Sequence, residues 1–328
     1  MTSHKPYSVF KDRVYATAVL FLLTTLTAWA DQQGGQRPAA YLELGAGGVQ
    51  NAMGGAAVGD RNDPACGYWN PAGLSGLRGF QIQDQYTLLP LGQQLNYFTL
   101  ANGFRDFFFY GISSFIYSAG GNLEARVGPS LAPDSLFSDL EMTYLVSVAF
   151  RLSPRWSIGG NVKILIQDFD NYSGFGFGED LGLQYRLTQY TTLGLMIQDP
   201  FTLFNYDNST ENIVPITVKA GVAHHDVQLD AKLNFDLEWS ADLGFRPRLG
   251  AEWRPVEVLA LRGGCWAGNI INGAPGGALS INPTAGFGVL VPLGPSGDGL
   301  LEFNYTLLMD RVVTGGLLHQ VEIAGKFL

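Results

Sequence analysis

The chain has few charged residues and a high share of apolar ones. Asp, Glu, Lys and Arg make up 15% of its 328 residues, where soluble domains average about 25%. Hydrophobic residues make up 46%, which is too many for a disordered chain. A formal net charge of −9 argues against a nucleic-acid partner. Beyond residue 30, no run approaches the roughly 18 consecutive apolar residues of a membrane-spanning helix.

Residues suited to catalysis or metal binding are also scarce. Of four histidines, His224 and His225 are chain neighbours that would point to opposite faces of a strand, which suits no single metal ion. The segment GLSGL around Ser75 misses the G-x-S-x-G spacing of a hydrolase. The run GAGGVQ at residues 45–50 lacks the third glycine of a dinucleotide loop. We therefore expect no catalytic residue, no metal, no cofactor and no enzymatic activity.

The first 30 residues have the pattern of an export signal. Lys5, Lys11 and Arg13 precede the mostly apolar run VYATAVLFLLTTLTAWA, which ends in small residues. This pattern predicts a cleaved signal peptide over residues 1–30. An exported chain that is rich in glycine and aromatic residues, poor in charge and without a spanning helix is typical of a β-barrel in the bacterial outer membrane.

Hydrophobicity alternates with period two along most of the remaining chain. In VQLDAKLNFDLEW, residues 227–239, every second residue from Val227 to Trp239 is apolar and every residue between them is polar. A barrel strand needs this alternation because one face meets lipid and the other meets the lumen. Such segments predict fourteen strands near the following positions: 79–87, 94–102, 106–118, 142–152, 155–168, 178–187, 191–198, 215–225, 227–238, 243–253, 256–264, 284–292, 297–307 and 318–328.

The links between these segments alternate in length. Every second link is short, such as Ser153-Pro154, whereas the links 119–141, 199–214 and 265–283 are long. Outer-membrane barrels join their strands by short periplasmic turns and longer outer loops. The sequence therefore predicts an all-β fold, a transmembrane antiparallel up-and-down barrel over residues 79–328. Four tryptophans are expected at its two membrane interfaces, namely Trp156, Trp253, Trp239 and Trp266.

A separate segment, residues 31–78, precedes the first predicted strand. It is rich in glycine and alanine, shows little periodicity and is too small to fold alone. Its end, GYWNPAGLSGL at residues 67–77, contains a rigid corner. Pro71 fixes its own φ, and the Asn70 side chain can bond to a neighbouring backbone group and hold a sharp bend. We expect this corner to be structural, with ligand contact as the alternative.

The text YLELGAGGVQNAMGGAAVGDRNDPACGYWNPAGLSGL, residues 41–77, resembles the N-terminal signature of the PorV/PorQ family. The matching residues are Leu44, Gly45, Gly47, Met53, Gly54, Gly55, Ala56, Asp63, Ala65, Trp69, Asn70, Pro71, Ala72, Gly73 and Leu74. The chain departs from that signature at Asn62-Asp63-Pro64 and at Cys66. The family belongs with the FadL-like outer-membrane transporters, so the resemblance implies that residues 31–78 form a small hatch inside a fourteen-stranded barrel.

The resemblance implies an accessory or cargo-binding role in type IX-like protein secretion, with secreted proteins or secretion-system components as partners besides outer-membrane lipid. A FadL-type passive transporter of hydrophobic small molecules is the alternative, and a structural or adhesive barrel is a third. A route for hydrophobic molecules needs an apolar lining. The predicted strands at 155–168, 178–187 and 227–238 have polar inward faces, which argues weakly against such a route. The segment FFFYGISSF at 107–115 is apolar on both faces and could line such a route.

Charged residues at inward positions predict an internal ion-pair and hydrogen-bond network, with an ion route as the alternative. The candidates are Lys163, Arg186, Asp230, Lys232, Asp236, Glu238, Glu302, Glu322 and Lys326. The chain has two cysteines, Cys66 and Cys265, and export to an oxidising compartment permits one disulfide between them.

Overall fold

The computed structural model describes residues 39–125, 135–169, 172–207, 211–241, 243–269, 279–294, 299–310 and 316–327. The predicted signal peptide at 1–30 lies outside these ranges. None of the described helices has the length and hydrophobicity needed to cross a bilayer.

Short helices precede and interrupt the strands: η1 (Ala40–Leu44), α2 (Gly48–Ala52), α3 (Cys66–Trp69), η2 (Pro71–Gly76) and η3 (Pro90–Gly92). The strands are β1 (Phe80–Leu88), β2 (Gln94–Arg105), β3 (Phe108–Ala125), β4 (Ser135–Arg151), β5 (Trp156–Phe169), β6 (Tyr172–Arg186), β7 (Thr191–Gln198), β8 (Leu203–Tyr206), β9 (Glu211–Ile213), β10 (Thr217–Asp226), β11 (Ala231–Ser240), β12 (Gly244–Val256), β13 (Leu259–Asn269), β14 (Leu279–Leu293), β15 (Gly299–Asp310) and β16 (Gly316–Phe327).

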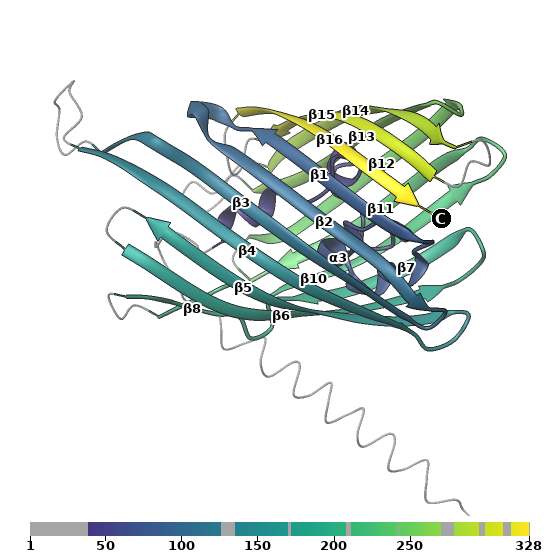
Figure 1. The fold of residues 1–328 in the computed structure, drawn as a ribbon, viewed down its shortest axis with the longest axis horizontal. Helices are drawn as coiled ribbons and strands as arrows, with labels where there is room; N and C mark the ends of the chain where they lie inside the picture. Colours follow the sequence, from purple (N-terminus) through teal and green to yellow (C-terminus); the bar gives the residue numbers. More distant parts are fainter. Residues whose placement is uncertain are drawn as a thin grey trace, which may run out of the picture. The chain divides into compact units, whose positions relative to one another are not determined.

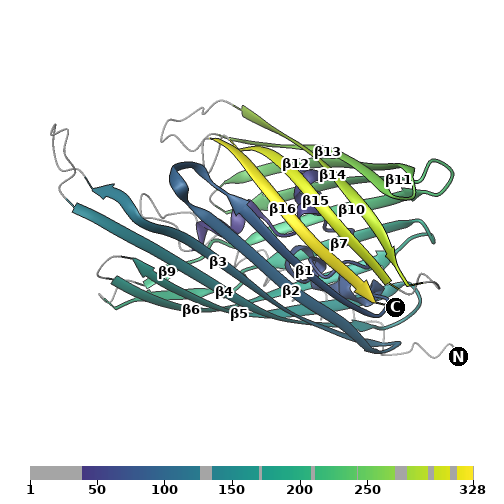
Figure 2. The ribbon, with the colours of Figure 1, turned by 45° about the horizontal axis from the view of Figure 1, so that its top comes forward.

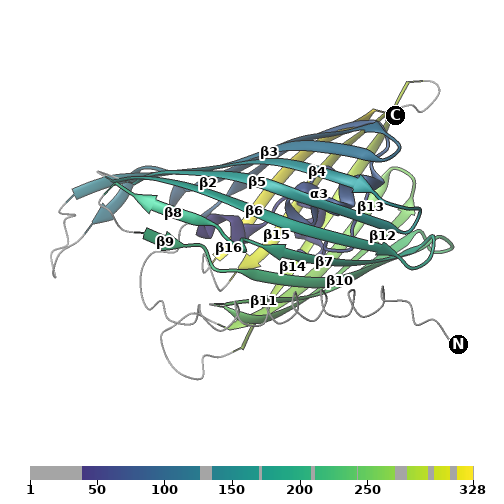
Figure 3. The ribbon, with the colours of Figure 1, turned by 90° about the horizontal axis from the view of Figure 1, so that it is seen from below.

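The strands close into an antiparallel barrel. β8 pairs with the first part of β6, and β9 pairs with β8. The other fourteen strands form a ring in which the first strand pairs with the last and β5 pairs with β6. Figure 1 and Figure 2 show these strands running obliquely around a common interior, and Figure 3 shows α3 within it. The predicted fold class is therefore confirmed. Ring closure leaves no unpaired edge in the main wall, as a β-structure in lipid requires.

The predicted alternation sets the two faces of the wall. On β11, Phe235 is 47% exposed on the outer face, whereas Asp236 is 1% exposed on the inner face. The same rule places Trp156 and Trp253 outward, at 45% and 53% exposure. Trp266 contradicts the girdle prediction, because it faces inward and is 9% exposed. It pairs across the ladder with Arg248, whose guanidinium carbon lies 5.5 Å from its ring centroid.

All three predicted long links contain strand, and the link 265–283 includes the end of β13 and the start of β14. The ladder between β3 and β4 resumes after an irregularity and reaches Ala125, so the predicted link 119–141 is largely sheet. The predicted link 199–214 contains β8 and β9. β8 continues β7 along β6, since Gln198 pairs with Asp180 and Leu203 pairs with Phe177. The chain kinks between them at Asp199, a non-glycine residue with φ of 57°.

Candidate functional site

We call residues 39–78, which lie among the inward side chains of the wall, the hatch. The 31–78 boundary stays a prediction, because its start lies outside the described residues. The hatch corner is built around Asn70. Its backbone is extended between α3 and η2, and its Oδ1 accepts a hydrogen bond from the Ala72 amide at 3.2 Å. With Pro71 in the first turn, this is an N-cap that stops one helix and starts the next.

The same side chain also fixes the corner to the wall. Asn70 Nδ2 donates to the carbonyl of Val58 within the hatch at 2.9 Å and to the carbonyl of Leu183 on β6 at 3.2 Å. β6 has no side chain at the point where the corner approaches it, because residue 182 is a glycine. A Cβ atom at Gly182 would lie 2.2 Å from Asn70 Oδ1. The Asn-Pro corner is therefore in direct contact with the wall in this conformation.

Trp69 contacts another segment of the hatch and also basic residues of the wall. Its Nε1 donates to the Ala46 carbonyl at 2.7 Å. Its ring lies 5.3 Å from Lys219 Nζ and 5.8 Å from the Arg248 guanidinium carbon. Both contacts fall within the range of a cation–π interaction. The motif residue Ala72 is fully buried, and a Cβ at Gly73 would lie 2.4 Å from the Asp60 carbonyl.

The second motif segment, Met53-Gly54-Gly55, lies against β12 and β13. Gly54 and Gly55 have φ values of 69° and 68°, which favour glycine. A Cβ at Gly54 would lie 2.8 Å from the backbone of Cys265. Met53 is fully buried, and its carbonyl approaches Gly250 of β12. Glycines on both sides thus let two backbones pack directly together.

Wall carboxylates accept hydrogen bonds from the hatch backbone. Asp236 Oδ2 accepts from the Ala57 amide at 2.6 Å and from the Val58 amide at 2.9 Å. Glu322 accepts from the Gly48 amide and from the Gln83 side chain. Lys232 completes this set with an ion pair to Asp60 of the hatch at 2.7 Å. Three of the predicted network residues therefore bind the hatch directly.

The remaining network pairs wall strands with each other. Glu302 accepts from Arg262 at 2.7 Å and pairs with Lys326 at 3.6 Å. Lys163 lies between Asp180 and Asp199, where it ties the β7–β8 kink to β5. Glu238 meets a set of basic residues that the sequence analysis missed, namely Arg246, Arg248 and Lys219. The sequence did contain a signal for their inward position, because Arg246 and Arg248 alternate with the apolar residues Phe245 and Leu249.

Two predicted network residues lie apart from it. Asp230 is in the turn before β11, with its side chain 54% exposed, and pairs with His225 at 3.3 Å. Arg186 donates to the Pro154 carbonyl and forms no ion pair with a described carboxylate. The other predicted network residues thus contact the hatch or other charged wall residues, whereas Asp230 and Arg186 lie at one rim of the barrel.

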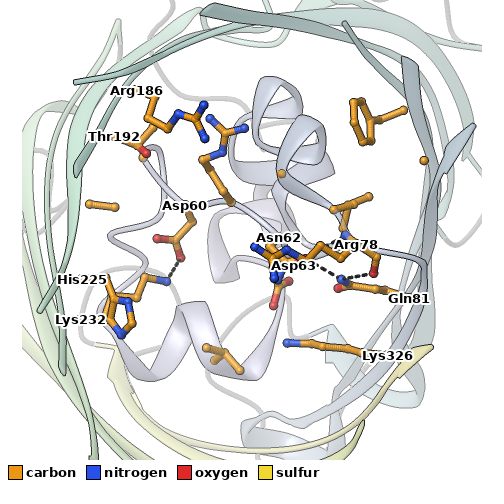
Figure 4. Close-up of a pocket in the computed structure, with 18 of the residues that line it drawn as sticks. Asp60, Asn62, Asp63, Arg78, Gln81, Arg186, Thr192, His225, Lys232 and Lys326 are labelled. Carbon is orange, nitrogen blue, oxygen red and sulfur yellow. Dashed lines mark hydrogen bonds and ion pairs between the residues drawn. The ribbon is translucent and has the colours of Figure 1, made fainter. Parts of the chain in front are cut away.

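A polar cavity of about 1410 Å³ occupies the short-turn end of the barrel. Figure 4 shows Asp60, Asn62 and Asp63 of the hatch across its floor, with Arg186 and Lys232 pointing in from the wall. The turns that line it include 103–106, 153–154 and 189–190. Arginines and lysines outnumber acidic residues in this lining.

An apolar cluster lies on the side of the hatch toward the long links. Tyr68 of the hatch packs on Phe115, with ring centroids 5.2 Å apart, and Phe115 packs on Tyr97 at 4.6 Å. Tyr41 stacks on Tyr117 at 5.8 Å. The buried aliphatic members from the wall are Leu95, Leu145, Leu165, Leu308 and Leu318. The predicted FFFYGISSF lining contributes Phe115 to this cluster and Phe109 to a smaller one beside Cys66.

The permitted disulfide does not form, and both thiols are free. Cys66 is buried in the hatch, where its Sγ donates to the Asp60 carbonyl at 3.4 Å. Cys265 lies on β13 between Gly264 and Trp266, so its side chain has the outward parity of Leu261 and points away from the hatch. Burial, and then the charges of Asp63 and Asp60, raise the pKa of Cys66 well above its ordinary value.

No cluster of three or more potential metal ligands occurs in the part of the chain that the structure describes. The geometry instead defines a hatch-containing barrel with an apolar surface on one side of the hatch and a basic cavity on the other. The protein class is therefore that of a β-barrel with an internally anchored hatch.

Comparison with solved structures places this fold beside FadL-type barrels. The toluene transporter TodX of Pseudomonas putida is similar over 86% of this chain and 97% of its own, with 14% identity and a TM-score of 0.60. The toluene transporter TbuX of Ralstonia pickettii matches 88% of this chain and 100% of its own, with 14% identity and a TM-score of 0.58. A FadL homologue of Pseudomonas aeruginosa has a TM-score of 0.61 at 13% identity, covering 86% of this chain and 97% of its own. No family model and no curated protein sequence matches the chain.

Proposed function

We propose that this protein is an outer-membrane channel for hydrophobic small molecules, non-enzymatic, with the hatch controlling passage. The observation that carries the proposal is the apolar cluster where the hatch meets β2 to β5. Phe115, Tyr97 and Leu145 of this cluster give the wall an apolar lining on this side of the hatch. Pockets for apolar ligands combine such a lining with a few polar groups. The similarity to two toluene transporters supports this choice over the structural or adhesive alternative.

In this conformation the hatch fills the apolar route. Tyr41, Leu42 and Leu44 are members of the same buried cluster as Phe115. Passage therefore requires displacement of this part of the hatch, while the wall carboxylates hold the remainder. Asp236 and Glu322 bind the hatch backbone outside η1, and within η1 Glu43 pairs with Arg246 at 2.6 Å, so displacement of η1 must break this ion pair.

Toluene uptake into proteoliposomes tests the proposal. Phe115→Gln replaces the phenyl ring in the apolar route with a smaller, polar amide, and we expect about a tenfold slower uptake, from the typical free energy of a buried phenyl group. Phe107→Gln is the control, because Phe107 is 50% exposed in the short turn before β3. Equal rates for wild type, both variants and protein-free vesicles would reject the hydrophobic route.

Protein secretion is the second candidate, and the observation that favours it is the match of residues 44–74 to the PorV/PorQ signature. Deletion of the gene tests it. Accumulation in the periplasm of proteins that are otherwise secreted would support secretion. Normal secretion together with loss of toluene uptake would support the channel alone.

A further inference from the structure

Three arginines at the short-turn end face the cavity without a carboxylate partner. Arg61 lies in the hatch, Arg151 ends β4 and Arg186 ends β6, and all three line the cavity of about 1410 Å³. Each is partly buried. None of them forms an ion pair with any carboxylate among the described residues. Asp106 lines the same cavity and is exposed in the β2–β3 turn.

Arg78 and Arg105 also line the cavity without an ion pair among the described residues, but both are exposed. The other inward basic residues of the described barrel that are at least partly buried behave differently. Each has a carboxylate partner, as shown by the ion pairs of Lys163, Lys219, Lys232, Arg246, Arg248, Arg254, Arg262 and Lys326. A plugged barrel is expected to pair its inward charges in this way. Arg61, Arg151 and Arg186 are therefore an exception. An anion from outside the chain would supply the partner that they lack.

Arg61 and Arg151 share one serine as hydrogen-bond acceptor, and Arg186 lies two strands away from Arg151. Arg61 donates to Ser75 Oγ at 3.1 Å, and Arg151 donates to the carbonyl of the same serine. Arg186 donates to the Pro154 carbonyl in the turn that follows β4. On the wall, β5 separates β4 from β6, so their axes lie about 10 Å apart, a span that two arginine side chains can bridge. Each guanidinium thus donates one hydrogen bond to a neutral oxygen, and its other N–H groups remain available to a ligand.

The charges of the group act on each other. Burial, followed by the charges of Arg186 and Arg151, lowers the pKa of Arg61 to about 10. Like charges that are partly shielded from water repel, and an oxyanion between them would remove this repulsion. The fork of N–H donors on arginine matches two oxygens of a carboxylate or phosphate.

We propose that Arg61, Arg151 and Arg186 form a binding site for the phosphate or carboxylate group of a small molecule at the short-turn end of the barrel. The cavity leaves room for an organic substituent beyond the anionic group. Because Arg61 belongs to the hatch and the other two arginines belong to the wall, the bound anion also ties the hatch to β4 and β6. This site lies on the opposite side of the hatch from the apolar cluster, so it does not depend on the proposed transport of hydrophobic solutes.

Calorimetric titration of the purified full-length protein in detergent at low ionic strength tests the site, with inorganic phosphate and sodium octanoate as separate probes. We expect saturable binding of at least one probe. Phosphate binding alone would identify a free oxyanion, and octanoate binding alone would identify the head group of an amphiphile. Arg186→Gln and Arg151→Gln are each expected to weaken binding on the order of tenfold, as loss of a charge-assisted hydrogen bond does.

Arg155→Gln is the matched control, because Arg155 lies in the same turn but outside the cavity lining. It should leave the affinity within about twofold of wild type. Absence of saturable binding of both probes to wild type would overturn the proposal, as would equal weakening by the control. If the glutamine variants fail to fold, protection of Arg61 and Arg186 from phenylglyoxal by the bound anion decides the question in wild type. A lack of protection would then overturn the site.

Discussion

The side-chain oxygen of Asn70 lies only 2.2 Å from the place where a Cβ atom on Gly182 would be. The hatch corner and β6 are therefore in contact through a glycine. Any side chain at this position must move Asn70 away from the wall. We expect Gly182→Val to cost about 1–3 kcal/mol by overpacking and to increase proteolysis of the hatch before the barrel unfolds. Gly263→Ala is the control, since a Cβ there meets nothing nearer than the Thr284 carbonyl at 3.9 Å.

Removing the amide of Asn70 should have a similar result by a different cause. Asn70→Ala loses the helix cap and the bonds to the carbonyls of Val58 and Leu183, at an expected cost of about 1–3 kcal/mol for unsatisfied buried groups. Urea unfolding of the reconstituted protein measures the change. Asn96→Ala, on the partly exposed outer face, is the control. An unchanged hatch and unchanged permeability in Asn70→Ala would contradict the structural role of the corner.

Asp236 gives a site-specific test of hatch anchoring. Asp236→Ala removes the acceptor of the Ala57 and Val58 amides, and we expect a loss of about 1.5–3 kcal/mol, as for bonds to a charged group. Hydrogen exchange of a peptide over residues 55–60 should accelerate. Asp226→Ala is a matched control, because Asp226 accepts two backbone amides in an exposed turn. Faster exchange in the control but not in Asp236→Ala would be the reverse of this prediction.

The buried cation Lys163 neutralises two carboxylates at the β7–β8 kink. Lys163→Met leaves Asp180 and Asp199 without it, and we expect a loss of about 3–5 kcal/mol, measured by urea unfolding. Lys219→Met should cost clearly less, because Glu238 keeps Arg246 and Arg248 as partners. Equal losses of unfolding free energy in the two variants would show that Lys163 does not stabilise the kink more than Lys219 stabilises its own site.

The two cysteines should differ in reactivity. A small maleimide is expected to label Cys265 in the folded protein and Cys66 only after unfolding, as mass spectrometry of the labelled peptides will show. Because the pKa of Cys66 is raised in the folded state, its thiol keeps its proton at pH values near 9, where an unfolded thiol ionises. Stability therefore falls as the pH rises above the unfolded pKa. A change in gel mobility on reduction would reveal a disulfide and refute the assignment.

Sequence patterning predicted much of the wall. Alternation alone located strands such as β7 at residues 191–198 and identified Asp236 and Glu238 as inward, because side chains on a strand change face at every residue. It failed for Trp266, where an aromatic residue type was taken as evidence of an interface position. Counting from Arg262 along the same strand gives the inward face of Trp266 and the outward face of Cys265.

The hatch could be predicted only in part. Asn70 and Pro71 indicated a corner because their backbone preferences are local. Its partner Gly182 lies 112 residues away in the chain, and nothing local to either residue shows their contact. The β7–β8 kink was missed for a similar reason, since Asp199 is held there by Lys163 of another strand.

The sequence by itself determined that this chain forms strands with one apolar and one polar face, since that depends on residue order within each segment. The tertiary structure decided which polar groups meet, because ring closure fixes the register of each strand and the hatch selects its acceptors from several strands. Asp236 thus holds the hatch backbone, Glu302 pairs with Arg262, and Arg61, Arg151 and Arg186 are left facing a cavity. These outcomes follow from distances in space that no single segment encodes.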